Sequence, residues 1–266
     1  MIAAPSSRKS AEAALAAIPG LGGARVVRRL VAGPTNVTWL VEHLDQRWVL
    51  RLDTPAAAEL GLDRENEGRA CAAVAAAGIA PAYRWFDAAA GVCLRHFVEG
   101  RALAPVDLRD TRRLERLAGT LRRLHRLPPV GRPFDPAGAV RRYAAALATP
   151  EAGRVAGRAL ASLTDTRRFA TPPAICHNDL VAENIIETEG QGLLLIDWEY
   201  TGTGDPMFDL AVVIRHHDLD AGLAQMFLEA YLQRPATAED SEHLSRQCRF
   251  YGHLLQLWNL RVGGAS

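Results

Sequence analysis

Two neighbouring stretches, CHNDLVAEN at residues 176–184 and LLLIDWEY at residues 193–200, are the most informative part of this sequence. Three of its side chains with carboxylate or amide oxygens are Asp179, Asn184 and Asp197. Oxygen ligands of this kind suit a Mg²⁺ ion that holds nucleotide phosphates. The three residues therefore predict a magnesium site if the fold brings them to one point.

A hairpin is the predicted means of gathering them. Residues 185–188 (IIET) and 193–196 (LLLI) are β-prone, and EGQG between them predicts a four-residue turn. Symmetric pairing about that turn places Asn184 opposite Asp197, at a strand spacing of about 4.8 Å. Asp179 precedes Asn184 closely enough to face the same point from a tight loop.

The same spacing occurs in the catalytic loop of protein kinases, where an Asp and an Asn share one loop and a metal-binding Asp follows. His177 holds the place of the histidine in that motif. The sequence has DWE at residues 197–199 where those enzymes have DFG. The difference points to a particular branch of the kinase-like proteins.

HND at residues 177–179, IDWEY at 196–200 and DPMFDLA at 205–211 resemble the choline/ethanolamine kinase and aminoglycoside phosphotransferase family. The likeness is strongest to bacterial choline kinases and thiamine kinase-like enzymes, and it extends over nearly the whole chain. Weaker matches are GPTN at 33–36, LDRENE at 62–67, GIAP at 78–81 and FVEG at 97–100.

The resemblance implies a kinase that uses ATP and Mg²⁺. Asp179 is expected to accept or orient the proton of the acceptor hydroxyl, and Asn184 and Asp197 to hold Mg²⁺ against the phosphates. His177 is expected to brace the loop rather than react. Asp209 is expected to support the same loop from a helix that begins at Asp205-Pro206.

For the nucleotide, the resemblance implies a basic residue on the third strand, paired with a helix glutamate. Arg51 and Glu67 fit these positions, and an arginine can bind phosphate through two N–H groups. A loop over the phosphates and a hinge beside adenine are also expected. The residues assigned to these two segments are Thr35, Asn36, Phe97 and Val98.

The acceptor is less sharply indicated. Tyr200 and Trp258 match positions that line the choline site in the family, and aromatic faces hold a quaternary ammonium by cation–π attraction. The run of Arg215, His216 and His217 instead suits a neutral or anionic substrate. Choline or a related amino alcohol is the leading expectation, and thiamine, a sugar or an aminoglycoside stay open.

The sequence predicts an α+β, bilobal, protein-kinase-like fold with an ATP cleft between its lobes. Residues 1–99 form the β-rich nucleotide-binding lobe, and residues 100–266 form the helical catalytic and substrate lobe. Predicted strands are 39–42, 48–52, 83–86 and 92–98. Predicted helices are 63–77, 108–127, 137–147, 221–233 and 241–260, after a first helix that Ser10 opens.

Composition bounds the remaining classes. The net charge is +1, with 31 basic and 30 acidic residues, so a nucleic-acid or membrane-surface partner is not expected. Four widely spaced cysteines predict a reducing, cytoplasmic setting. We expect a small-molecule hydroxyl substrate and a monomer or homodimer. The alternatives of another class are a nucleotide-binding pseudoenzyme and a phosphohydrolase with metal ligands His177, Asp179, His216, His217 and Asp218.

Overall fold

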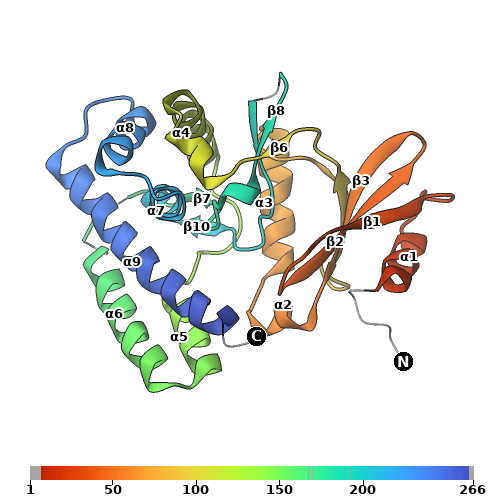
Figure 1. Cartoon of the computed structure of the whole chain (residues 1–266), viewed down its shortest axis with the longest axis horizontal. Helices are drawn as coiled ribbons and strands as arrows, with labels where there is room; N and C mark the ends of the chain where they lie inside the picture. The colour runs from red at the N-terminus through yellow and green to blue at the C-terminus, as the bar shows by residue number, and fades with distance from the viewer. Residues whose placement is uncertain (1–6, 167, 170, 191, 264–266) are drawn as a thin grey trace. The chain divides into compact units, whose positions relative to one another are not determined.

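The computed structural model describes residues 7–166, 168–169, 171–190 and 192–263. The chain divides into two compact units, Met1–Glu99 and Gly100–Ser266 (Figure 1). The first unit is built on a β-sheet and the second is mostly helical, which confirms the predicted α+β class. Over the described ranges, no helix combines the length and the apolarity needed to cross a membrane.

The sheet of the first unit is antiparallel, with strand order β1-β2-β3-β5-β4. Helix α1 packs on it, and Ala11 and Leu15 join Val41 and Leu50 in one buried apolar cluster. The elements are α1 (Arg8–Ala17), β1 (Arg25–Ala32), β2 (Asn36–His43), β3 (Gln46–Asp53), α2 (Pro55–Glu59), α3 (Arg64–Ala76), β4 (Tyr83–Asp87) and β5 (Val92–His96).

Several boundaries differ from the prediction. The first helix is capped by Ser7, whose hydroxyl accepts from the Ser10 amide at 3.1 Å, so the assignment of Ser10 as its start was wrong. Leu44 and Asp45 both have positive φ, which is typical of a two-residue hairpin turn and lengthens both flanking strands. The strand expected to reach residue 98 ends at His96.

Strand β1 was not predicted. It lies at the edge of the sheet, and most of its side chains, three arginines among them, are exposed or half-buried. An edge strand of this kind lacks the regular apolar alternation by which a strand is found in a sequence. Its pairing with β2 also carries two irregularities in register, which break the period further.

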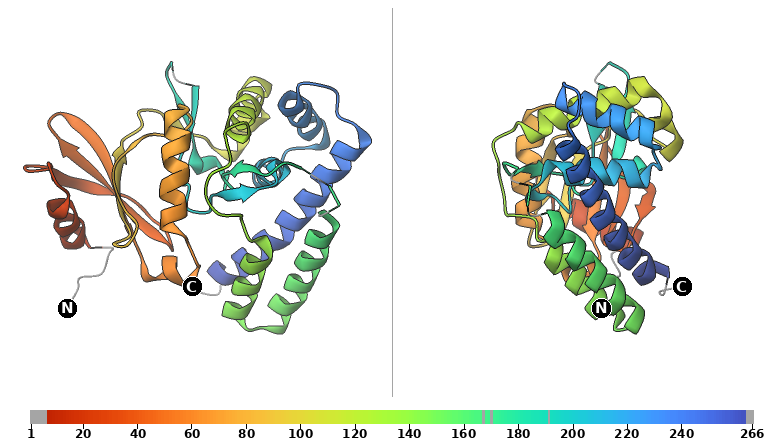
Figure 2. Two further views of the ribbon diagram at one scale, coloured as in Figure 1. Left: turned by 180° about the vertical axis from the view of Figure 1, so that it is seen from behind. Right: turned by 90° about the vertical axis from the view of Figure 1, so that its left-hand side faces the viewer.

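In the second unit, helices surround a small group of short strands. Helices α5, α6 and α9 pack together (Figure 2). The elements are β6 (Arg101–Ala102), η1 (Pro105–Arg109), α4 (Thr111–His125), α5 (Pro136–Leu147), α6 (Pro150–Thr166), β7 (Ala174–Cys176), η2 (Ala182–Asn184), β8 (Ile185–Thr188), β9 (Gly192–Leu195), β10 (Gly202–Gly204), α7 (Pro206–His216), α8 (Ala221–Leu232) and α9 (Ala238–Gly263).

The predicted hairpin forms, but its register differs by one residue. Ile185 pairs with Leu195 and Thr188 pairs with Gly192, so the connection is residues 189–191 rather than four residues. Asn184 consequently lies opposite Ile196, whose amide donates to the Asn184 carbonyl at 2.9 Å. The expectation that Asn184 faces Asp197 across the ladder was wrong, because Gly192, at φ +86°, joins the second strand.

Helix α7 begins as predicted, with Asp205 as its N-cap and Pro206 in the first position. The Asp205 carboxylate accepts from the Met207 amide at 3.0 Å and, on its other oxygen, from His243 at 2.5 Å and Gln247 at 2.6 Å. Burial raises the pKa of Asp205, but the bonds and charge of His243 outweigh it and hold the pKa below its ordinary value.

This carboxylate gives the fold a pH-dependent term. Because the folded-state pKa is lowered, ionised Asp205 adds stability above its unfolded pKa of about 3.9, and that stability is lost as the pH falls through the folded pKa. Asp205→Asn should therefore cost roughly 1 kcal/mol of unfolding free energy at pH 7 and progressively less in acid. Urea unfolding against pH measures this. Asp220→Asn, at the N-cap of α8, is the control, and an equal Asp205→Asn penalty at every pH would contradict the account.

Candidate active site

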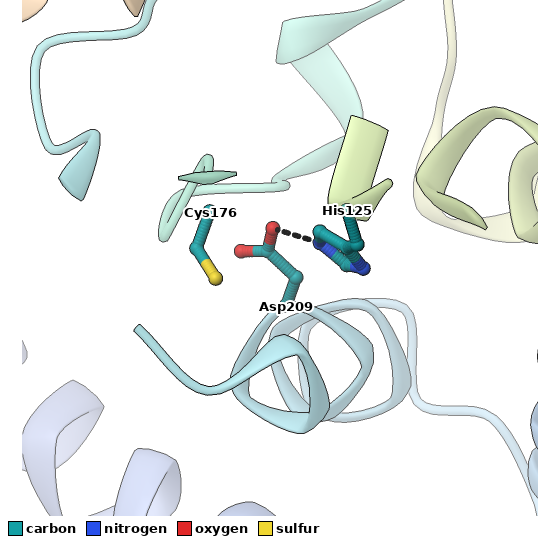
Figure 3. A group of neighbouring side chains, drawn as sticks. All are labelled: His125, Cys176 and Asp209. Carbon is teal, nitrogen blue, oxygen red and sulfur yellow. Dashed lines mark hydrogen bonds and ion pairs between the residues drawn. The ribbon is translucent and has the colours of Figure 1, made fainter. Parts of the chain in front are cut away.

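The loop at residues 177–184 is held by Asp209, a buried residue in the first turn of α7. One carboxylate oxygen of Asp209 accepts from the His177 amide at 2.9 Å, and the other accepts from the Asn178 amide at 2.7 Å. His125, from α4, lies 3.0 Å from the same carboxylate (Figure 3). These contacts agree with the bracing role expected of Asp209.

His125, Cys176 and Asp209 lie close enough together to suggest a metal site, and they form the one such group of three within the described ranges. Both Asp209 oxygens are already engaged by backbone amides, however, and the Cys176 thiol lies 3.6 Å from the Ala174 carbonyl. Figure 3 shows the carboxylate between the other two side chains. The arrangement is that of a structural brace.

The five ligands considered for a phosphohydrolase are not gathered into one group of this kind in the part of the chain that the structure describes. His177 accepts from the Asp179 amide through Nδ1 at 3.3 Å, and its Nε2 lies 2.9 Å from the Ile196 carbonyl. Its ring packs against Trp198, with centroids 4.5 Å apart. With both nitrogens bound to backbone, His177 is placed to fix the loop, as expected.

Asp179 and Asn184 are brought together as predicted. The buried Asn184 side chain donates through Nδ2 to the Asp179 carbonyl at 2.9 Å and to its carboxylate at 3.1 Å. Asn184 is positioned by the short helix η2, immediately before β8. Since Nδ2 is committed to Asp179, the Asn184 Oδ1 atom is the group that can face a cation.

Asp197 lies near enough to Asp179 to influence its charge, and its position is set by its own backbone turn rather than by strand pairing. Its φ of +63° is uncommon for a residue with a side chain, and such strained positions cluster at functional sites. Burial, followed by the charges of Asp197 and Glu199, raises the pKa of Asp179 to about 8. The carboxylates of Asp179 and Asp197 and the amide oxygen of Asn184 are oxygen donors of the kind that Mg²⁺ prefers.

The two predicted aromatic residues meet through a third that the sequence reasoning missed. Tyr143, on α5, forms a side-chain hydrogen bond with Tyr200, and its ring centroid lies 5.6 Å from that of Trp258 on α9. Tyr143 is the one aromatic residue in the alanine-rich sequence of α5. That isolation is the signal by which it could have been found.

Acidic residues act on Tyr200, while Tyr143 is influenced by Asp179 and also by Arg142 and Arg261. Burial, then Tyr143 and the carboxylates of Glu199, Asp179 and Asp197, raise the pKa of Tyr200 far above its ordinary value. Glu199 is itself buried. The aromatic cluster therefore stands beside carboxylates, an environment that suits a cation.

Arg215, His216 and His217 do not form a continuous positively charged surface. His217 is buried, with Nε2 3.4 Å from the Leu180 carbonyl, and burial together with His216 lowers its pKa to about 4. His216 lies 3.9 Å from Glu183. Arg215 is exposed at the end of α7. These three residues therefore give little reason to exclude a cationic substrate.

In the first unit, Arg51 and Glu67 form the predicted pair. The Arg51 guanidinium, on β3, donates to both Glu67 oxygens, at 2.6 and 2.8 Å. Arg64, which was not predicted, donates to Glu67 at 2.8 Å and to both oxygens of Asp53. Burial opposes the charge of Glu67, but Arg51 and then Arg64 hold its pKa below the ordinary value.

The other nucleotide candidates also lie in this unit. Thr35 and Asn36 are buried beside the β1–β2 turn, where the Asn36 amide group donates to the Thr35 hydroxyl at 3.2 Å. The Phe97 amide donates to the Arg47 carbonyl at 3.0 Å, so it is already used within the sheet. Val98 follows directly, and its backbone N–H and C=O groups are the better candidates for hydrogen bonds to the adenine ring of a nucleotide.

Known proteins resemble this chain in sequence and in fold. Residues 26–243 match the phosphotransferase enzyme family (APH). Protein LicA of Haemophilus influenzae is 31% identical over 212 residues, which cover 76% of this chain and 61% of LicA. The chain thus spans about three-fifths of the length of that relative.

Solved structures share the fold. A choline/ethanolamine kinase family protein from Mesorhizobium loti superposes with a TM-score of 0.76 and 25% identity, covering 95% of this chain and 85% of that one. LicA in complex with AMP superposes with a TM-score of 0.76 and 22% identity, covering 94% and 87%. These likenesses confirm the predicted fold class.

Proposed function

The chain belongs to the phosphotransferase enzyme family, and from that premise we propose that it transfers the γ-phosphate of ATP to a hydroxyl group of choline or a related amino alcohol. The membership confirms the resemblance found in its motifs. The observation that carries the acceptor is the cluster of Tyr143, Tyr200 and Trp258 beside the carboxylates of Asp179 and Glu199.

Asp179 is proposed as the catalytic base. Its carboxylate lies next to Asn184, and burial with the charges of Asp197 and Glu199 raises its pKa, which makes it a better proton acceptor than an ordinary aspartate. The Asn184 amide fixes the orientation of the carboxylate. Asp179 would take the proton of the acceptor hydroxyl. The hydroxyl oxygen would at the same time bond to the γ-phosphorus, and the bond between the γ-phosphorus and the leaving ADP would break.

Asn184 and Asp197 are proposed to hold Mg²⁺. When bound, Mg²⁺ neutralises charge on the phosphates and so stabilises the transition state. The Asn184 Oδ1 atom and the Asp197 carboxylate supply the hard oxygen donors that this ion prefers.

The nucleotide is proposed to be held by residues of the first unit. Arg51, fixed by Glu67, would contact the phosphates. Thr35 and Asn36 would cover them, and the backbone of Val98, beside Phe97, would hold adenine. The AMP bound in the LicA structure supports a nucleotide of this class. The ATP cleft, a cytoplasmic location and a monomer or homodimer stay predictions.

The choice of a cation follows from charge and aromatic surface together. A quaternary ammonium gains about 0.5–2 kcal/mol over an aromatic face, more when it is desolvated. Carboxylates beside the rings add attraction for the same group and would repel an anionic substrate. Thiamine also carries a cationic ring and a primary hydroxyl, so it is the second candidate that this site favours. Neutral sugars and the larger aminoglycosides gain less from it.

A comparison of choline with its neutral isostere tests the proposal. 3,3-Dimethyl-1-butanol has the shape and hydroxyl of choline without the charge. Coupled ADP detection should show turnover of choline with KM at least tenfold below that of the isostere. Ethanolamine, thiamine, sugars and an aminoglycoside complete the screen. Equal use of choline and the isostere would contradict a cation site, and ADP release without an acceptor would contradict a kinase.

Removing one aromatic face should weaken the acceptor alone. Trp258→Leu is expected to raise KM for choline about two- to thirtyfold while KM for ATP stays the same. Trp258→Phe keeps an aromatic face and should keep most of the affinity. Steady-state kinetics with either substrate varied measure both constants. The assignment of Trp258 fails if the leucine and phenylalanine variants behave alike.

A further inference from the structure

A pocket lies in the helical unit, on the side of His125 that belongs to the ends of α4 and α8. Its volume is about 470 Å³, and Asp179, Asn184 and Asp197 do not line it. The pocket is formed by the C-terminal ends of α4 and α8, which pack side by side (Figures 1 and 2), and by the starts of α7 and α9. Nothing in the proposed kinase reaction uses it.

Two arginines of this pocket have no carboxylate partner. Arg122 and Arg126 stand one helical turn apart at the end of α4, so their side chains share a face. The Arg122 guanidinium donates to the Ala230 carbonyl at 3.1 Å, and the Arg126 guanidinium makes no hydrogen bond or ion pair with any residue that the structure describes. The wall therefore presents two guanidinium groups.

The other charges of the wall do not cancel them. Arg234 is fully engaged by Asp240, through bonds of 2.6 and 3.0 Å. Glu239 is the one further acid of the lining, and it is exposed in the first turn of α9. The pocket keeps a positive excess on the side of α4.

The rest of the wall is largely apolar or aromatic, with Met207, Phe169, Leu232 and the ring of Tyr231. The Tyr231 hydroxyl is already bound to His125 Nδ1 at 3.0 Å, so the ring rather than the hydroxyl is left for a ligand. A wall of this kind takes an organic group rather than a bare ion.

We propose that this pocket binds a small phosphate monoester that carries an apolar or aromatic group. Guanidinium groups bind phosphate oxygens through paired N–H donors, and two of them match the charge of about −1.5 to −2 on a monoester. The organic group would lie against Met207 and the ring of Tyr231, since Phe169 already stacks on His243 with centroids 4.4 Å apart. This site is independent of the proposed kinase function.

Calorimetric titration with phenyl phosphate, without nucleotide or Mg²⁺, tests the pocket. We expect wild-type protein and Asp197→Asn to bind it equally, because Asp197 does not line the pocket. Arg126→Gln should weaken binding about tenfold, through loss of a charge-assisted contact. Arg112→Gln, which removes a charge from the exposed start of the same helix, should change nothing. Phenol and inorganic phosphate, which are the two halves of the probe, should each bind more weakly.

The outcomes against the proposal are distinct. Unchanged binding in Arg126→Gln, or no binding by wild type, would overturn it. Loss of binding in Asp197→Asn would place the probe in the active site instead. Equal binding of inorganic phosphate would overturn the assignment of an organic ester. Because Arg126 is exposed, its replacement leaves the fold intact, whereas Arg122 also holds the end of α8.

Discussion

Asp179→Asn is expected to lower kcat by about 10²–10⁴-fold with little change in KM for ATP. The change removes the group that accepts the hydroxyl proton but keeps the size of the side chain and the contact with Asn184. Coupled ADP release in the presence of the acceptor measures the turnover, and thermal shift with MgATP measures nucleotide binding.

The matched control is Asp165→Asn, an exposed carboxylate of the same unit that pairs with Arg246 at 3.3 Å. It should retain the wild-type rate. Full acceptor-dependent turnover by Asp179→Asn would show that another group takes the proton, and the assignment of the base would then be wrong. Loss of nucleotide binding along with turnover would point instead to a structural role for Asp179.

The second large effect is expected at Asp197. Asp197→Asn should lower kcat/KM for MgATP by about 10²–10³-fold, because it removes the charged oxygen donor that is proposed to hold Mg²⁺. Asparagine, like aspartate, tolerates the positive φ of this position, so the backbone should stay in place. Activity measured against Mg²⁺ concentration should show a higher requirement for the ion.

Asp218→Asn is the control for this variant, since Asp218 is an exposed aspartate of the same unit that also has positive φ. It loses the same charge on the same kind of backbone, and should keep wild-type activity and Mg²⁺ dependence. If Asp197→Asn responds to Mg²⁺ as the wild type does, Asp197 is not a ligand of the ion.

The core of the site could be predicted because it depends on local spacing. Asp179 and Asn184 sit in one short loop, and the pair forms as expected. The register of the hairpin could not be predicted, because Gly192 is able to enter the strand at a positive φ that other residues avoid. Asp197 is aimed by its own backbone turn rather than by strand pairing.

Contacts between distant segments were harder to find. Arg64 pairs with Glu67 at i,i+3 on the same helix, which spacing could have shown, but its two bonds to Asp53 join α3 to β3 and sequence spacing does not reveal them. Tyr143 meets Trp258 because α5 packs against α9. Helix α6 was missed altogether, since Gly153 and Gly157 weaken the helical pattern that its buried residues carry.

The most direct test of the central claim is a crystal of the protein grown with Mn²⁺ and a non-hydrolysable ATP analogue, measured at a wavelength where manganese scatters anomalously. The account predicts an anomalous peak bonded to the Asn184 Oδ1 atom and the Asp197 carboxylate, with the Asp179 carboxylate beside the γ-phosphate. A manganese peak held by other side chains, with Asn184 and Asp197 outside its coordination shell, would contradict it.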